Sequence, residues 1–539
     1  MSDALEVVAT GAAADAVASL VPRLVETRFA SRLFDQDPTL WGAEAESEAA
    51  VRLAWVGLHR TSRPLLGEIA ALRSELNDEG VDRVVLCGMG GSSLAPEVIC
   101  ATAGVELTVL DSSDPDAVRD ALRDDLDRTV VVVSSKSGST VETDSQRRAY
   151  GQAFRDAGID PTRRIVIVTD PGSPLDKEAR ASGHRVINAD PNVGGRYSAL
   201  TAFGLVPSGL AGADIEALLV EADFVADLLA EDDEANPGLR LGAAIAGTTP
   251  LRDKLVMVDE GSGLVGFAGW AEQLIAESTG KNGTGLLPVV VDHSSAPEVA
   301  LPPHDVTVVR LAEDTDGEEE DRTSGSDVSV TGPLGAQMLL WEVATATAGH
   351  ILGINPFDQP DVESAKKAAR EMLEGSPETV PPNFADGPVE VRALGGDWLG
   401  NAATTADAVR ALLSRLDDKA GYVAVMAYLD RASLGGLEDV RRSLSVRTRR
   451  PVTFGWGPRF LHSTGQFHKG GPPVGVYIQI TGEPFDDLPV PGRDFTFGTL
   501  ISAQAAGDAQ VLADHDRPVL RLHLTDQPAG VPAVLGALR

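Results

Sequence analysis

Two loops rich in serine and glycine, each directly after a run of apolar and β-branched residues, are the part of this chain best suited to bind an anion. Residues 84–87 lead into the loop 88–93 (GMGGSS), and residues 130–133 lead into the loop 134–140 (SSKSGST). Runs of this kind are typical of buried parallel strands, and open α/β sheets bind ligands beyond the carboxyl ends of their strands. Small residues let the backbone approach a phosphate, which hydroxyls and amides at a helix start can then bind.

The second loop carries the stronger signal. A simple helix N-cap would explain one hydroxyl, but four hydroxyls around a lysine favour a phosphate cradle, with the helix dipole and the lysine adding positive potential. The residues that we expect to bind phosphate are Gly91, Ser92, Ser135, Lys136, Ser137, Ser139 and Thr140. The weaker alternative is a nicotinamide cofactor, for which Asp111 could bind a ribose, but the first loop has no GxGxxG pattern.

Composition narrows the class of partner. The chain has 539 residues, and its 43% of hydrophobic residues is typical of a globular protein. Its formal net charge is −34, so nucleic acid and an anionic membrane would repel it. Its two cysteines, Cys87 and Cys100, fit a reducing cytoplasm. The first ten residues lack a basic start followed by an apolar core, and no apolar run reaches 18 residues, so we expect neither a secretory signal nor a membrane span.

The elements that must position the loops follow from hydrophobic periodicity. Residues 1–80 read as a helical segment, and strand–helix alternation over 81–235 predicts a doubly wound parallel sheet of about five strands. Residues 236–539 form the second predicted domain, with strands near 254–258, 289–291 and 306–311, a helix over 334–352, and further alternation from about 385 to the end.

Together with the two loops, four later motifs identify a family. The loops are similar to those of a sugar isomerase (SIS) domain, and the later motifs begin at Gly194 (GGRYS), Gln273 (QLIAESTGK), Phe357 (FDQPDVESAK) and Leu461 (LHSTGQ). The combination resembles the glucose-6-phosphate isomerase family from about residue 35 to the end. The segment 460–471 resembles the isomerase part of bacterial fusions with transaldolase, although we expect a stand-alone isomerase. The resemblance implies an α/β fold with two SIS-type doubly wound parallel-sheet subdomains in three layers, behind an N-terminal helical segment and followed by a C-terminal extension.

The resemblance also implies roles for particular residues. Glu277 is the expected base that moves a proton between C1 and C2, although composition alone would favour a solvated glutamate at a helix end. Arg196 would stabilise the enediolate, since a guanidinium keeps its charge. Lys366 would act near the ring oxygen, while Gln273 and Gln359 would contact the substrate.

His462 is the expected ring-opening group, because imidazole transfers protons near neutral pH. In the family the corresponding histidine precedes the FDQ motif, whereas here it follows, and His468 is a nearby rival. In related dimers this histidine reaches the site of the neighbouring subunit, so the resemblance implies a homodimer.

The sequence therefore predicts a cytoplasmic enzyme that interconverts D-glucose 6-phosphate and D-fructose 6-phosphate through an enediolate. We see no histidine and carboxylate spacing suited to zinc or manganese, and we expect no metal and no cofactor. Two alternatives remain: an isomerase that also accepts mannose 6-phosphate, and a non-catalytic sugar-phosphate-binding protein on the same fold.

Overall fold

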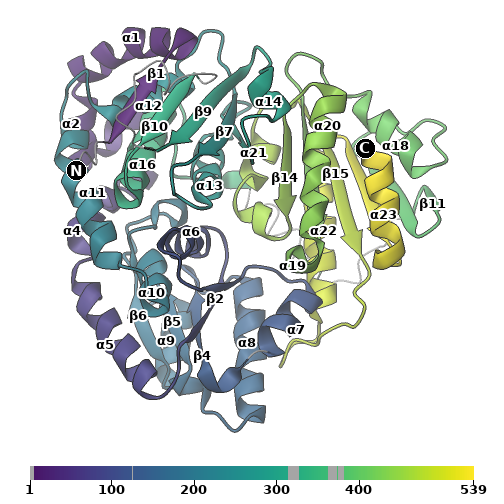
Figure 1. Ribbon diagram of the computed structural model, residues 1–539, viewed down its shortest axis with the longest axis horizontal. Helices are drawn as coiled ribbons and strands as arrows, with labels where there is room; N and C mark the ends of the chain where they lie inside the picture. The colour runs from purple at the N-terminus through teal and green to yellow at the C-terminus, as the bar shows by residue number, and fades with distance from the viewer. Residues whose placement is uncertain (1–4, 124, 314–326, 362–372, 374–380) are drawn as a thin grey trace.

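Three β-sheets flanked by helices make up the part of the chain that the structure describes (Figure 1). The structure is a computed structural model and describes residues 5–123, 125–313, 327–361, 373 and 381–539. Helix α13 (Phe267–Thr279) lies near the centre, where it contacts helices that belong to each of the three sheets. None of the helices in the described ranges is long and apolar enough to cross a lipid bilayer.

The first sheet has five parallel strands in the order β3-β2-β4-β5-β6. Its strands are β2 (Arg83–Gly88), β3 (Thr108–Leu110), β4 (Thr129–Ser134), β5 (Ile165–Thr169) and β6 (Arg185–Asn188). Its helices are α6 (Leu94–Ala103), α7 (Pro115–Arg123), α8 (Val141–Asp156), α9 (Pro174–Ala181) and α10 (Ala202–Ala211). The predicted doubly wound parallel sheet is confirmed. Because β3 lies on one side of β2 and β4 on the other, the strand order reverses between β2 and β4, which is where such sheets bind ligands.

The second sheet also has five strands, in the order β1-β10-β9-β7-β8. They are β1 (Glu6–Ala9), β7 (Lys254–Glu260), β8 (Leu287–Val291), β9 (Val306–Ala312) and β10 (Val328–Thr331). The helices of this part are α1 (Gly11–Glu26), α2 (Phe29–Phe34), α3 (Glu46–Ala49), α4 (Leu58–Thr61), α11 (Ile215–Ala230), α12 (Pro237–Ala246), α13, α14 (Pro297–Ala300) and α16 (Leu334–Leu352), whereas α5 (Pro64–Asp78) packs against α10 of the first sheet. The N-terminal segment differs from the all-helical expectation at β1, where two adjacent valines pair antiparallel with the edge of β10.

The C-terminal extension builds a sheet of its own, with six strands in the order β11-β12-β16-β15-β13-β14. They are β11 (Phe384–Asp386), β12 (Val389–Leu394), β13 (Tyr422–Tyr428), β14 (Val452–Trp456), β15 (Gly475–Gly482) and β16 (Val519–Leu524). Its helices are α18 (Thr405–Leu413), α19 (Arg431–Leu434), α20 (Val440–Thr448), α21 (Gly465–Gly470), α22 (Phe497–Asp514) and α23 (Gln527–Leu538). We call residues 384–539 the C-terminal unit.

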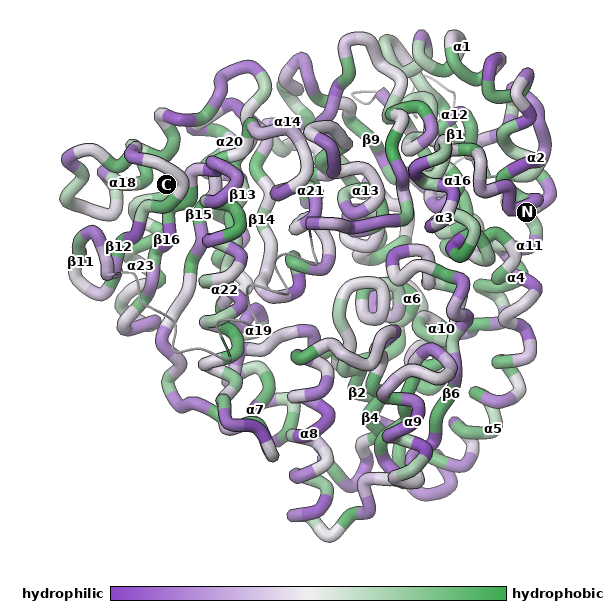
Figure 2. Tube along the Cα trace, turned by 180° about the vertical axis from the view of Figure 1, so that it is seen from behind, coloured by the Kyte–Doolittle hydropathy of each residue, from purple (hydrophilic) through white to green (hydrophobic). Residues whose placement is uncertain are grey.

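Continuous hydrophobic packing joins the three sheets. Strands β2 and β4 are apolar between their terminal residues (Figure 2), and the four valines of β4 are buried. One core cluster contains Val256 of the second sheet together with Tyr422 and Ile501 of the C-terminal unit. Another contains Val131 of the first sheet together with Phe497. Burial of this much apolar surface holds the three sheets in a fixed arrangement.

Candidate active site

A cavity of about 720 Å³ is lined by residues from all three sheet-bearing parts of the chain. The predicted site residues that line it are Gly91, Ser92, Ser135, Lys136, Ser137, Ser139, Thr140, Arg196, Gln273, Glu277, Gln359 and His462. Lys366 lies outside the described residues. The cavity therefore brings together residues that are up to several hundred positions apart in the sequence.

One end of the cavity is formed by the two serine-rich loops at the strand-order reversal. The hydroxyl oxygens of Ser137 and Ser139 lie 2.8 Å apart, and Ser135 Oγ donates to Thr140 Oγ1 at 3.2 Å. Thr140 is the N-cap of α8, yet its side chain makes no capping hydrogen bond. Gly138 has a φ of +69°, and a Cβ at this position would lie 2.5 Å from that of Leu175, so the turn requires glycine. Hydroxyls and a helix N-terminus thus face a common space, as an anion site requires.

Lys136 is paired rather than free at this end of the cavity. Its Nζ lies 2.6 Å from Asp170 Oδ2, and burial lowers its pKa although Asp170 opposes the shift. The positive potential that we expected from this lysine is therefore largely neutralised by Asp170. Hydroxyl and amide donors remain as the main source of affinity for an anion at this end.

The first loop packs directly against the turn that carries Arg196. This turn is η6 (Gly195–Tyr197), and the loop contains η3 (Gly90–Ser92). A Cβ at Gly91 would lie only 1.9 Å from the carbonyl oxygen of Gly195, so a larger residue at position 91 would separate the two. The close approach places the Arg196 turn beside the anion-binding loops.

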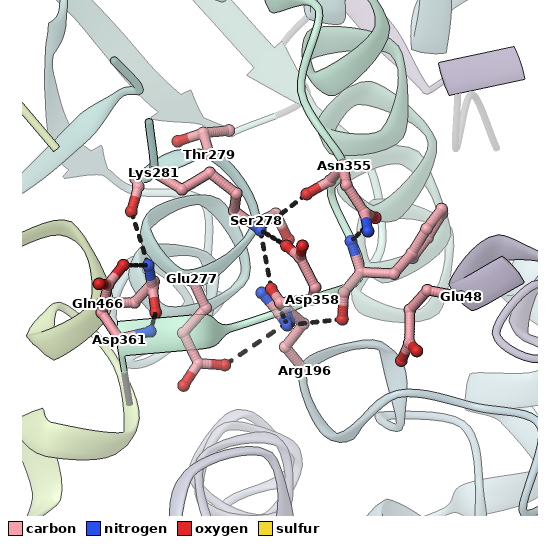
Figure 3. Close-up of polar contacts among 12 residues, drawn as sticks. Glu48, Arg196, Glu277, Ser278, Thr279, Lys281, Asn355, Asp358, Asp361 and Gln466 are labelled. Carbon is pink, nitrogen blue, oxygen red and sulfur yellow. Dashed lines mark hydrogen bonds and ion pairs between the residues drawn. The ribbon is translucent and has the colours of Figure 1, made fainter. Parts of the chain in front are cut away.

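Glu277 and Arg196 form a buried pair, with Glu277 on α13 and Arg196 opposite (Figure 3). Arg196 Nε lies 3.6 Å from Glu277 Oε2, and each residue is only 4% exposed. Gln273, one turn before Glu277, donates from Nε2 to the same Oε2 at 3.3 Å. A carboxylate in this position is held by a guanidinium and an amide and still faces the cavity, as a base that moves a carbon-bound proton must.

The other nitrogens of Arg196 reach the loop 355–358. Nη2 donates to the carbonyl oxygens of Phe357 and Asp358, each at 3.0 Å, whereas the buried Nη1 has no hydrogen-bond partner among the described residues. Lys281 holds the same loop from the end of α13, because its Nζ donates to Asn355 O and Asp358 O at 2.7 Å and lies 2.6 Å from Asp358 Oδ1 (Figure 3). Burial, and secondarily the charge of Arg196, lowers the pKa of Lys281 to about 8. Lys281 thus orders the carbonyls that aim Arg196.

His462 lies in η8 (Arg459–His462) and lines the cavity of its own chain. Its Nε2 is 3.3 Å from Glu142 Oε1, which also accepts a hydrogen bond of 2.6 Å from Gln504 Nε2 on α22. A buried carboxylate in contact with an imidazole orients the ring and favours a proton on the nitrogen that faces it. Sequence reasoning missed both partners. Glu142 belongs to the motif of the second loop, which could have drawn attention to it, whereas nothing near Gln504 in the sequence distinguishes it.

The rival histidine has a different environment. His468 is buried between two tyrosines, with Nδ1 3.0 Å from Tyr422 Oη, and burial lowers its pKa to about 3. It is not part of the cavity wall. The geometry therefore favours His462 over His468 as the group that faces a ligand.

A further carboxylate of α13, Glu272, contacts the turn that follows His462. It is half-buried and accepts a hydrogen bond from Ser463 Oγ at 3.4 Å. Burial raises the pKa of Glu272 to about 7, with Arg459 opposing the shift. It does not line the cavity.

The family model and the relatives that match this chain name the same family of isomerases. The family model of phosphoglucose isomerase matches residues 74–244. A probable glucose-6-phosphate isomerase of Methanococcus maripaludis is 30% identical over 360 residues, which cover 56% of this chain and 81% of the relative. One of Natronomonas pharaonis is 33% identical over 341 residues, covering 54% and 79%.

Two solved structures share the fold. A hypothetical protein from Thermus thermophilus aligns with a TM-score of 0.58 and 26% identity, covering 69% of this chain and 100% of that one. A glucose-6-phosphate isomerase from Chlamydia trachomatis aligns with a TM-score of 0.50 at 20% identity, covering 65% and 78%, and supports the fold alone.

Proposed function

We propose how the residues of the cavity carry out the reaction of the glucose-6-phosphate isomerase family, to which this chain belongs. The chain catalyses the reversible isomerisation of D-glucose 6-phosphate and D-fructose 6-phosphate. The observation that carries the proposed mechanism is the buried Glu277 carboxylate beside Arg196, in a cavity whose other end is a cradle of hydroxyls and a helix N-terminus.

The phosphate binds at the serine-rich loops. Ser92, Ser135, Ser137, Ser139 and Thr140 donate to its oxygens, and the start of α8 favours its charge. Because Asp170 pairs with the nearby lysine, this site binds the dianion mainly through neutral donors. Such hydrogen bonds to a charged group are among the stronger ones in proteins.

His462 and Lys366 open the sugar ring. Opening moves a proton from the C1 hydroxyl to the ring oxygen. The imidazole of His462, oriented by Glu142, transfers that proton, and Lys366 stabilises the ring oxygen.

Glu277 then moves a proton between the two carbons. Its carboxylate removes the proton from C2 of the open-chain aldose, and the electron pair of that bond forms the enediolate double bond while the carbonyl oxygen gains negative charge. Arg196 stabilises this oxygen, for which the buried Nη1 is an available donor. The protonated Glu277 returns the proton to C1 while the hydroxyl proton on O2 passes to O1, which yields the C2 ketone and the C1 hydroxyl of the ketose. Gln273 and Gln359 contact substrate hydroxyls.

The test is a coupled assay with fructose 6-phosphate in the presence of a chelator, since none of these steps needs a metal ion. We expect turnover unchanged by the chelator. Binding of the sugar phosphate without turnover would refute the catalytic proposal, and loss of activity that added metal restores would refute the metal-independent mechanism.

We also propose a cytoplasmic location, which the two buried free cysteines support. We further propose that the chain divides into a segment over 1–80, a domain over 81–235 and a domain over 236–539 that includes the C-terminal unit. All strands of the first sheet lie within 81–235, which supports this division. The resemblance further implies a homodimer, which a measurement of mass in solution tests.

A further inference from the structure

The ring-opening histidine comes from a part of the chain that folds around its own core. The C-terminal unit has a separate sheet, and one hydrophobic cluster of the molecule is made only of its residues, from Val389 to Leu538. Within this unit, β14 leads into η8 and His462, and α21 follows. Leu461 and Gln504 of this unit also line the cavity, whereas both anion-binding loops, Arg196 and Glu277 belong to the parts of the chain that carry the other two sheets.

The C-terminal unit meets the first sheet at the histidine itself. His462 and Gln504 both contact Glu142 at the start of α8, and an added Cβ at Gly90 would lie 3.0 Å from His462 Cβ. The absence of a side chain at Gly90 therefore leaves the space that the histidine-bearing turn occupies. These contacts lie within one chain.

Ion pairs hold the histidine-bearing turn in place. Arg459, three residues before His462, pairs with Glu97 on α6 and with Asp111 after β3. Arg431 on α19 also pairs with Glu97, at 3.0 Å. We call Arg431, Arg459, Glu97 and Asp111 the arginine clasp. The two carboxylates belong to the first-sheet part of the chain, and the two arginines belong to the C-terminal unit. The clasp therefore joins these two parts of the chain at a point three residues before His462.

A second set of bonds attaches the same unit to the helix of the base. Gln466, four residues after His462, donates from Nε2 to Gly280 O at 2.9 Å and to Asp361 Oδ2 at 2.6 Å, and it accepts from Asp361 N at 3.1 Å (Figure 3). Gly280 directly follows α13, which carries Glu277. The unit therefore bridges the phosphate-binding loops and the base.

We infer that each chain completes its own active site, with the C-terminal unit supplying the ring-opening histidine in cis and the arginine clasp positioning it. This inference rests on the proposed function. It departs from the expectation, drawn from related dimers, that the histidine enters the site of a neighbouring subunit. Association of two copies is then not needed for turnover, and the C-terminal unit takes the place of the second subunit.

The decisive experiment is complementation between two inactive variants. His462→Ala and Glu277→Gln are prepared separately and then co-expressed in equal amounts. If each site is built within one chain, the co-expressed protein has no more activity than the average of the two variants. If the histidine acts in trans, a two-fold dimer with random pairing recovers about a quarter of wild-type activity, because one site of each mixed dimer carries both native residues. Such recovery would overturn the inference.

The activities of the two single variants test the proposed function separately from the cis arrangement. If either single variant alone keeps near-normal turnover, the catalytic roles are wrong, and the inference falls with them before any mixing. If both variants are inactive and mixing restores activity, the roles stand and only the cis arrangement is refuted.

Arg459→Met tests the clasp as a positioning device. We expect kcat on fructose 6-phosphate to fall by about tenfold to a hundredfold, since misplacement of a catalytic group by about 1 Å has effects of this size. KM is expected to stay the same. Turnover of 5-deoxy-D-fructose 6-phosphate, which has no O5 and cannot close a furanose ring, should be unaffected, because this ketose needs no ring opening.

Two controls make this result specific. Arg442→Met removes an exposed arginine that contacts Ser295 at 3.5 Å, away from η8, and should leave both substrates unaffected. Asp111→Asn weakens the clasp without creating a cavity and should reproduce the Arg459→Met pattern. An unchanged kcat on fructose 6-phosphate, or an equal loss on both substrates, would overturn the positioning role of the clasp.

Discussion

Replacement of Glu277 by glutamine tests the central step of the proposed mechanism. The amide keeps the size and the hydrogen bond to Gln273, but it cannot accept a carbon-bound proton. General bases contribute about 10²–10⁴ in rate, so kcat should fall by that factor, equivalent to about 3–5 kcal/mol in activation free energy. KM should change little, because the serine-rich loops that hold the phosphate are untouched.

The structure predicts a second consequence of the same change. Arg196 is 4% exposed and loses the only carboxylate paired with it among the described residues. Removal of one partner of a buried ion pair typically lowers the free energy of unfolding by about 3–5 kcal/mol. The carbonyls of Phe357 and Asp358 still accept from Nη2, so we expect a loss at or below the lower end of that range, measured by urea denaturation.

Glu277→Asp separates charge from position. It keeps the charge beside Arg196 but withdraws the carboxylate by one carbon–carbon bond, about 1.5 Å. A displacement of this size should lower kcat by about a hundredfold with a smaller loss of stability than the glutamine variant. If only charge mattered, the aspartate variant would be nearly as active as the wild type.

The assay couples glucose 6-phosphate formation from fructose 6-phosphate to an NADP-dependent dehydrogenase, and circular dichroism checks the fold of each variant. Glu216→Gln is the matched control, because Glu216 is exposed in the first turn of α11 and does not line the cavity. A Glu277→Gln enzyme with kcat within about tenfold of wild type would refute the role of this residue as the base.

Two further predictions follow from the anion cradle and from the loop behind Arg196. Ser137→Ala should raise KM for fructose 6-phosphate about tenfold or more with little change in kcat, because a hydrogen bond to a charged group contributes about 1.5–3 kcal/mol. The control is Ser414→Ala, which changes an exposed serine outside the cavity. An equal KM in both variants would exclude Ser137 from phosphate binding. Lys281 makes three polar contacts and burial lowers its pKa to about 8, so it loses a proton, and one donor, as pH rises through that value. We therefore expect the kcat of the wild-type enzyme to fall above about pH 8. In Lys281→Arg the side chain stays protonated, so the fall in kcat should move to higher pH. Identical pH profiles of the two enzymes would show that Lys281 does not control the fall in kcat.

The combination of charges in the cavity has a consequence for the salt dependence of substrate binding. An acidic protein that binds a dianion through hydroxyls and amides gains its affinity from short-range, directional bonds rather than from long-range attraction. Binding of sugar phosphates to this site should accordingly depend less on ionic strength than binding to a lysine-rich site would.

The local features of this protein could be predicted from its sequence. The five strands of the first sheet, strands β7, β8 and β9 of the second and the helix α16 were predicted close to their observed positions, because β-branched runs and helical periodicity are properties of neighbouring residues. Strands β1 and β10 of the second sheet were not predicted. The two anion-binding loops could be recognised for the same reason, since small and hydroxyl residues after a buried strand have few other uses.

Only the tertiary structure shows the contacts by which distant residues share the cavity and orient one another. His462 and His468 are nearly equivalent as sequence neighbours, but the fold directs one to Glu142 and buries the other between tyrosines, and no local pattern encodes that difference. Glu142 and Gln504 are 362 residues apart, and their contact depends on the packing of Phe497 against the first sheet. The same packing brings the ring-opening histidine of the C-terminal unit into the site of its own chain, because burial of apolar surface between sheets depends on the whole fold and not on the spacing of residues along the chain.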